Sequence, residues 1–297
     1  MAKTSVTNVQ LEAHPHKKQS EIVRILKQLR KNKLAMAGLF IFIVECLLAL
    51  LSPLIIPYSV TEMDFTAVYT GPSSAHLFGC DDMGRDIFSR ILYGGRYSLT
   101  IGLVAVAFAV FFGIIIGAVA GYYGGQVDNI IMRLLDVIQA IPGMLLMIVI
   151  SAVLGNGFFQ TIIAMSVGTI PGMARMLRAQ MLKERGNEYI EASISINCSQ
   201  PRIIFNPLLP NCLSPIIVQA TMGVAQTITL AAGLSFIGLG IKPPSPEWGA
   251  MLSASRAFMR DYPHMVIFPG LAIAITVLSL NLLGDGLRDA LDPKLKT

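Results

Sequence analysis

Charged residues are scarce in this sequence. Of its 297 residues only 14% are Asp, Glu, Lys or Arg, whereas 54% are hydrophobic and the mean hydropathy is +0.63. In a water-soluble domain about a quarter of the residues are charged. The shortage of charge therefore argues against a soluble globular protein.

Residue patterns that would supply catalytic chemistry are also missing. The four histidines are scattered and form no group with the spacing of metal ligands. No phosphate-binding loop of the form GxxxxGK(S/T) occurs, so we expect no nucleotide site in this chain. The sequence predicts no catalytic residue, no bound metal and no cofactor.

Long apolar runs account for nearly half of the chain. Each is about as long as a helix that crosses a bilayer, which takes roughly 20 residues. A soluble protein with buried core helices is the alternative, but so many runs of this length are not typical of one. We therefore predict an all-α integral membrane protein with six transmembrane helices. The runs are 34–56, 98–120, 130–154, 158–176, 213–238 and 265–283.

The distribution of basic residues predicts the side on which each loop lies. Cytoplasmic segments of membrane proteins carry an excess of Lys and Arg. Six spans and a cytoplasmic N-terminus place 177–212 and the C-terminus inside as well, together with most of the 23 Lys and Arg. On this topology Cys80 is the only cysteine outside, so we expect no disulfide within the chain.

The first 33 residues form a separate basic segment. Residues 18–33 mix Ile, Val and Leu with Arg and Lys, which suits an amphipathic helix on the anionic inner surface of the membrane. A solvated run of charge is the alternative. The expected divisions are the basic segment 1–33, the first span with an outer loop 34–97, and a helical bundle 98–297.

Small residues recur every fourth position in the second apolar run, which indicates a helix face that another helix approaches closely. These residues are Ala105, Ala109, Gly113, Gly117 and Gly121.

Two acidic side chains, Asp136 and Glu45, fall inside other predicted spans. Asp136 follows Arg133 by three residues, which predicts an ion pair on one helix.

Glu45 lies near the middle of the first apolar run. A central acidic residue costs about 2.5–3.5 kcal/mol on insertion scales, so it should face protein or water. We favour a protonated Glu45 that is hydrogen-bonded to a neighbouring helix. A proton-coupled secondary transporter, in which Glu45 would carry the proton, is the alternative.

Residues 188–211 form a polar stretch with helix-start and helix-stop signals in it and just before it. Asn187 is a plausible N-cap, and Glu188 and Glu191 would lie in the first turn, where carboxylates favour the positive end of the helix dipole. Asn197 suits the left-handed position after the helix, and Ser199 would cap a second short helix. Isoleucines along the stretch give it an apolar face, which predicts a docking surface; a self-packed loop is the alternative.

The same stretch resembles the EAA-x3-G-x(11)-LP loop of ABC importer permeases. Glu191, Ala192 and Ser193 correspond to EAA, Asn197 to the glycine, and Leu209 and Pro210 to LP. Serine for alanine and asparagine for glycine are departures, but both residues fit the local conformation. In that family the loop contains a coupling helix that docks on a cytoplasmic ATPase subunit.

Further motifs are similar to those of the dipeptide, oligopeptide and nickel permease subfamily. The segment 76–86 resembles HLLGTDxxGRD, and segments near the second, third and sixth spans and around the single tryptophan also match. From about residue 31 onward, the chain resembles the C-type permease subunit. The matching positions are Gly79, Asp81, Gly84, Arg85, Asp86, Arg133, Asp136, Glu247, Trp248, Gly249, Asp285, Arg288 and Asp289.

The resemblance implies a type I ABC importer transmembrane domain and a set of partners. These are a homologous second permease, two ATPase subunits that hold ATP and Mg²⁺, and an extracytoplasmic substrate-binding protein. It also implies a multi-pass protein of the bacterial cytoplasmic membrane that is not itself an enzyme. Di- and oligopeptides are the expected cargo, with nickel chelates or glutathione-like solutes as alternatives.

An intramembrane aspartyl protease is an alternative from a different class of protein, with Asp136 and Asp285 as its dyad. Such a dyad needs both carboxylates at the same depth around one water. Asp285 comes at the end of its apolar run beside Arg288 and Asp289, so a solvated helix end explains it.

Overall fold

The computed structural model describes residues 27–291, and over this range its secondary structure is helical apart from one isolated bridge between Cys80 and Asp86. The predicted amphipathic helix at 18–33 lies largely outside the described residues. The elements are α2 (Lys33–Ile55), α3 (Ile87–Tyr123), α4 (Gly125–Gln139), α5 (Gly143–Leu154), α6 (Phe158–Arg185), α7 (Glu188–Ser195), α8 (Gln200–Ile203), a π-helix η1 (Ile204–Leu208), α9 (Leu209–Phe236), α10 (Trp248–Ser255), a 3₁₀ turn η2 (Arg256–Phe258) and α11 (His264–Leu291).

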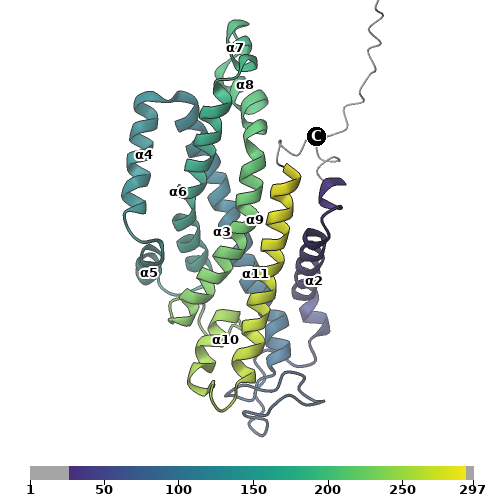
Figure 1. The fold of residues 1–297 in the computed structure, drawn as a ribbon. Helices are drawn as coiled ribbons and strands as arrows, with labels where there is room; N and C mark the ends of the chain where they lie inside the picture. The colour runs from purple at the N-terminus through teal and green to yellow at the C-terminus, as the bar shows by residue number, and fades with distance from the viewer. Residues whose placement is uncertain (1–26, 292–297) are drawn as a thin grey trace, which may run out of the picture.

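The long helices form one elongated bundle. Figure 1 shows α2, α3, α6, α9 and α11 running along its length, with α7 and α8 at one end and α10 at the other. The start of α2 and the end of α11 lie toward the α7 end (Figure 1), and the Gln28 side chain donates to the Asp289 carbonyl at 3.4 Å. Both ends of the described chain therefore lie on the side of the polar loop, as the six-span topology requires.

Four of the described helices, α2, α3, the continuous α8–α9 segment and α11, are long and apolar enough to cross a membrane. The pair α4 and α5 raises the number to five if it counts as one broken span. Although α6 is 28 residues long and packs along α3, its polar inner half keeps it out of that group. An all-helical membrane protein is confirmed, and the number of six spans stays a prediction.

The predicted third span, 130–154, is not one helix. Its two halves, α4 and α5, are bent by 80° at the break 140–142. Pro142 explains the break, because it has no backbone N–H to donate and it disfavours helical geometry at Ile141. Pro142 takes the N-cap position of α5 with φ −50° and ψ 129°.

The stripe of small residues on α3 packs against α6, as its spacing predicts. A Cβ atom on Gly117 would lie 2.5 Å from the Ala174 carbonyl oxygen, and one on Gly113 or Gly121 would lie 2.6 Å from the Cβ of Met173 or Met181 respectively. Lipid gives helices no hydrophobic drive to associate, so close backbone packing of this kind holds them together. The two helices form the central pair of the bundle.

Because the obstacle at Gly117 is backbone, we expect Gly117→Ala to destabilise the protein by about 1–3 kcal/mol, the usual cost of overpacking. Gly172→Ala on α6 is the matched control, since nothing lies within 4 Å of its added Cβ. Thermal unfolding of the purified protein in detergent should show a lower midpoint for Gly117→Ala only. Equal midpoints would contradict the tight α3–α6 contact.

Candidate functional site

The polar loop begins with α7, whose ends agree with the sequence prediction. Asn187 is the N-cap, and Glu188 and Glu191 are exposed in the first turn. The Asn187 side chain donates to the Glu184 carboxylate at 2.7 Å instead of accepting from a backbone N–H of the helix, so the capping bond is not made. Asn197 has φ 55°, the predicted left-handed position that ends the helix.

The second helix of the loop differs from the prediction. Ser199 is the N-cap of α8, but α8 does not end as a separate short helix. It continues through the π-helix into α9, whose first two residues are Leu209 and Pro210. Pro207 cannot donate to the helical ladder, and the chain accommodates it by a wider turn in which the Leu209 N–H donates to the Ile204 carbonyl.

The apolar residues of the loop fall into two groups. Ile190 and Ile203 are buried and anchor α7 and α8. Ile194, Ile196 and Phe205 point the other way and are 55%, 76% and 69% exposed. The loop therefore has a root in the bundle and an apolar surface at its tip, near the exposed Glu191 and Ala192. The residues that receive the root are Leu177, Met181, Leu208, Cys212 and Ile216.

Ser193 replaces the family alanine without disturbing α7. Its hydroxyl donates to the Tyr189 carbonyl at 2.8 Å, one turn back in the same helix. A serine in this position satisfies its own polar group locally. The substitution therefore leaves the tip surface unchanged in shape.

At the opposite end of the bundle, the outer loop is built around a buried ion pair. Asp81 Oδ2 accepts from Arg85 Nε at 2.7 Å, and Asp81 Oδ1 accepts from the Arg85 N–H at 2.9 Å. Asp81 is 7% and Arg85 4% exposed. Asp86 caps α3 by accepting from the Ser89 N–H at 2.7 Å, and its other oxygen lies 3.0 Å from His76 Nδ1.

Two glycines of the outer-loop motif have backbone conformations that other residues rarely adopt. Gly79 has φ +77° and Gly84 has φ +71°. A Cβ on Gly84 would lie 1.9 Å from the Asp64 carbonyl oxygen, so the site excludes a side chain as well. These positions fix the course of the loop.

Arg90 belongs to the same buried cluster, although the sequence analysis did not single it out. It is 4% exposed, donates to the Val60 carbonyl at 2.7 Å and lies 3.6 Å from Asp81 Oδ2. The available signal was that Arg90 is one of few basic residues in the outer segments and closely follows an acidic motif. The cluster ties the start of α3 to the outer loop.

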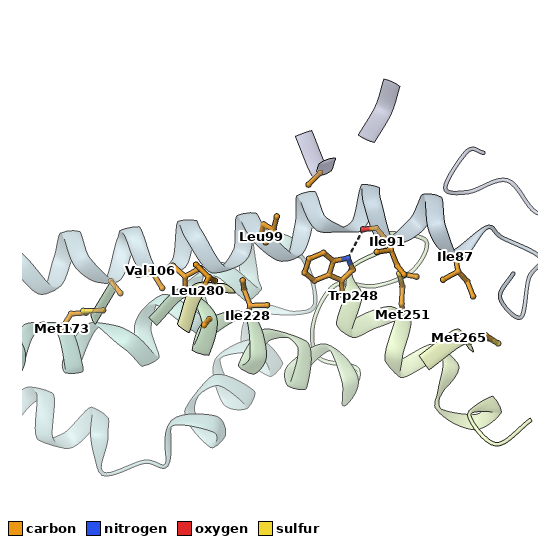
Figure 2. Packing of buried hydrophobic residues seen from close by; sticks show 14 residues of the cluster. Ile87, Ile91, Leu99, Val106, Met173, Ile228, Trp248, Met251, Met265 and Leu280 are labelled. Atoms are coloured by element: carbon orange, nitrogen blue, oxygen red, sulfur yellow. Dashed lines mark hydrogen bonds between the residues drawn. The ribbon is translucent and has the colours of Figure 1, made fainter. Parts of the chain in front are cut away.

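Glu247, Trp248 and Gly249 hold α10 against α3. Glu247 accepts from the N–H groups of Gly249 and Ala250 at 2.9 and 2.8 Å, and burial raises the pKa of its carboxyl more than these bonds lower it. Trp248 donates from its indole to the Ile91 carbonyl at 2.9 Å (Figure 2). The tryptophan lies within the main apolar core (Figure 2), so these residues are structural in position.

Cys80, in the same outer loop, is fully buried at 0% exposure. Burial also raises the pKa of its thiol, which lowers its reactivity. From its predicted position in the outer loop a reagent added outside would be expected to reach Cys80, and its burial shows that this expectation is wrong. All four cysteines are free in the described part of the chain.

Glu45 lines an apolar cavity of about 310 Å³ between α2, α3 and α11. Its carboxyl lies beside Thr276, and Oε2 is buried without a hydrogen-bond partner among residues 27–291. Most of the other lining residues are apolar, among them Phe78, Trp248 and Phe268. An apolar surrounding of this kind suits an uncharged carboxyl.

Asp136 makes the predicted contact with Arg133, at 3.7 Å on the same helix, but its shorter contact is across the bundle. Arg175 of α6 donates to Asp136 at 2.6 Å. A second pair of this kind, Arg178 with Asp128, also joins α6 to α4. Sequence reasoning missed both interhelical pairs because nothing in the spacing aligns these two helices.

Asp285, Arg288 and Asp289 are exposed at the inner end of α11. Arg288 lines a hollow of about 210 Å³ with Ser214 and Gln219 of α9. Asp136 of α4 is paired with Arg133 and with Arg175 of α6, and Figure 1 shows α6 and α9 between α4 and α11. The arrangement gives no support to an aspartyl protease.

The fold is that of an importer transmembrane domain. A solved structure of the MetNI methionine ABC transporter in an inward-facing conformation aligns with a TM-score of 0.56 at 20% identity, over 69% of this chain and 97% of that one. The type I ABC importer transmembrane fold predicted from the sequence is thereby confirmed.

The sequence defines the family. A family model described as binding-protein-dependent transport system inner membrane component matches residues 113–297, and one described as the N-terminal TM domain of oligopeptide transport permease C matches 20–72. The chain belongs to this family of membrane permease subunits, in its dipeptide and oligopeptide type.

Curated relatives match over almost the whole chain. The dipeptide transport system permease protein DppC of Alkalihalophilus pseudofirmus is 47% identical, covering 91% of this chain and 89% of the relative. The glutathione transport system permease protein GsiD of Pectobacterium atrosepticum is 45% identical, with the same two shares. DppC of Haemophilus influenzae is 44% identical, over 90% of this chain and 92% of the relative.

The surroundings of Glu45 predict that its charge is not needed. Glu45→Gln keeps the size and one carbonyl oxygen, so we expect solute uptake within about twofold of wild type, as for a neutral buried group. The measurement is uptake at pH 6 and pH 8 with membrane abundance checked by immunoblot. Loss of uptake at normal abundance would favour the proton-coupled alternative.

Proposed function

We propose that this chain is one of two permease subunits of an ATP-driven importer and forms half of the path for di- and oligopeptides. A homologous permease supplies the other half, and an extracytoplasmic binding protein delivers the cargo. Two ATPase subunits hold ATP and Mg²⁺ and drive the cycle. The chain itself carries no catalytic group and resides in the bacterial cytoplasmic membrane with both ends in the cytoplasm.

The geometry of α7 is the observation that carries the proposal. Its tip exposes Ile194, Ile196 and Glu191, and its root at Ile190 is buried against α6 and α9. An exposed apolar patch beside charged residues is a typical protein-binding surface. A partner that moves α7 would therefore move the bundle.

Two cargo classes are supported by relatives of nearly equal identity. Dipeptide permeases at 47% and 44% favour peptides, and a glutathione permease at 45% makes glutathione the second candidate. Glutathione is itself a modified tripeptide, so both cargoes present free carboxylates and an amine.

Uptake of a labelled dipeptide in the presence of unlabelled glutathione separates the two cargo classes. We expect glutathione to lower dipeptide uptake only weakly.

Glu191→Lys tests the docking role of α7. The change puts a positive charge at the positive end of the helix, which costs about 0.3–1 kcal/mol locally. Helix insertion depends on apolar length and is unaffected. We expect normal membrane abundance, less ATPase recovered with the purified permease, and at least about tenfold lower dipeptide uptake, as for a residue in a protein interface.

Asn197→Gly is the matched control, since glycine adopts the left-handed position at no cost. It should keep both ATPase recovery and uptake near wild type. Full ATPase recovery and full uptake by Glu191→Lys would show that α7 is only a connector.

The orientation of the chain can be tested with cysteines. Ser74 is exposed in the outer loop, and Cys198 is half-buried beside α7. An impermeant maleimide should label Ser74→Cys in intact cells, whereas Cys198 should react only after permeabilisation. Buried Cys80 should stay unlabelled in both cases. Labelling of Cys198 from outside in sealed cells would overturn the cytoplasmic assignment of the loop.

A further inference from the structure

The helix α4 is set off from its neighbours along the chain by a backbone break at each end. It begins at Gly125 directly after Gly124, two glycines that have φ +54° and +65° respectively, and it is bent by 80° from α5 at 140–142. Neither junction continues a helix, so the backbone fixes the direction of α4 only weakly. Its position in the bundle depends on side-chain contacts.

Apolar packing supplies little of that contact. Only Asp128 and Leu135 of α4 are buried in this chain. A stripe on the opposite face is exposed, with Ile130, Leu134 and Val137 at 61%, 63% and 70%. A helix that buries so little apolar surface within its own chain is held by other forces.

Two arginines of α6 supply the missing contacts. Arg178 donates to both oxygens of Asp128, with Nε at 2.5 Å from Oδ1. A side-by-side arginine–carboxylate pair of this kind fixes orientation as well as distance. Three residues earlier, Arg175 donates to the Asp136 carboxylate at 2.6 Å and also to the Gln139 side chain. The two arginines therefore bind both the start and the end of α4.

The Asp128–Arg178 pair is the more sheltered of the two. The side chain of Asp128 is 10% exposed and that of Arg178 32%, against 50% and 38% for Asp136 and Arg175. A sheltered pair is screened less by salt than an exposed one. Removal of one partner leaves the other charge uncompensated.

The same stretch of α6 is joined rigidly to α7. Leu177 and Met181, on either side of Arg178, are fully buried in the cluster that also buries Ile190 of α7. Gly117 and Gly121 of α3 pack closely against the same stretch. Arg178 therefore moves with α6 and with the root of the docking helix.

We propose that the Asp128–Arg178 pair transmits the movement of the α6–α7 unit to α4, and that Asp128 and Arg178 are positioning residues for transport. A tilt of α7 turns α6, the bidentate pair carries α4 with it, and the breaks at its two ends absorb the change. This inference rests on the proposed coupling of the chain to ATPases. It adds the residues through which that coupling reaches the third span.

Charge reversal tests the pair in the complete transporter, with both permeases, the ATPases and the binding protein, in membrane vesicles. The readout is dipeptide uptake per ATP hydrolysed, which a merely structural contact would not change. Asp128→Arg and Arg178→Asp should each lower this ratio at least about tenfold, and the double swap should recover it to within about threefold of wild type. Asn129→Arg, an exposed neighbour on α4, is the matched control and should keep the wild-type ratio.

Wild-type ratios in the two single variants, or no recovery in the double swap, would overturn the proposal. If the reversed variants do not accumulate in the membrane, Asp128→Asn and Arg178→Lys decide it. These keep the side-chain size but lose the bidentate pair, so an unchanged ratio in both would overturn the proposal and a lowered one would support it. Absence of ATP-driven uptake by the wild type is a distinct result, which would overturn the proposed function itself.

Discussion

The close contact between α3 and α6 is the constraint on which the rest of the structure depends. In a bilayer the surrounding lipid is as apolar as the side chains, so helices associate by fitting their backbones together. Gly113, Gly117 and Gly121 provide that fit, with approaches that leave no room for a Cβ. Because α6 is fixed in this way, its inner half can carry arginines toward α4 on one side and support α7 on the other.

The two ends of the bundle are stabilised by different forces. At the outer end Asp81, Arg85, Arg90 and Glu247 are nearly fully buried, and hydrogen bonds to backbone groups or to one another hold them in place. At the inner end the Asp136–Arg175 pair between α4 and α6 is partly exposed, the Asp128–Arg178 pair is more sheltered, and apolar side chains remain uncovered at the tip of α7. Buried, hydrogen-bonded polar groups make a rigid structure, whereas exposed ion pairs contribute little to stability. Movement should therefore concentrate at the inner end.

Features that depend on neighbouring residues in the chain could be predicted from the sequence. The left-handed Asn197, the close-packed glycine face of α3, the Arg133–Asp136 contact and five of the six apolar runs as helices follow from local chemistry. The break at 140–142 lies at Pro142, and a proline marks an interruption of a span without indicating its size, here 80°. The burial of Cys80 and the pairs of Arg178 and Arg175 depend on how distant segments meet, which periodicity does not record.

The departure of Ser193 and Asn197 from the family motif shows which property of the loop matters. Asn197 keeps the left-handed turn that glycine would provide, and Ser193 bonds within its own helix, so α7 keeps its length and direction. Its root at Ile190 is enclosed by α6 and α9, whereas its tip is free. A short helix held at one side and exposed at the other transmits a force applied to its tip into the helices at its root. The motif therefore specifies the conformation of α7 and its attachment to the bundle more than the identity of particular side chains.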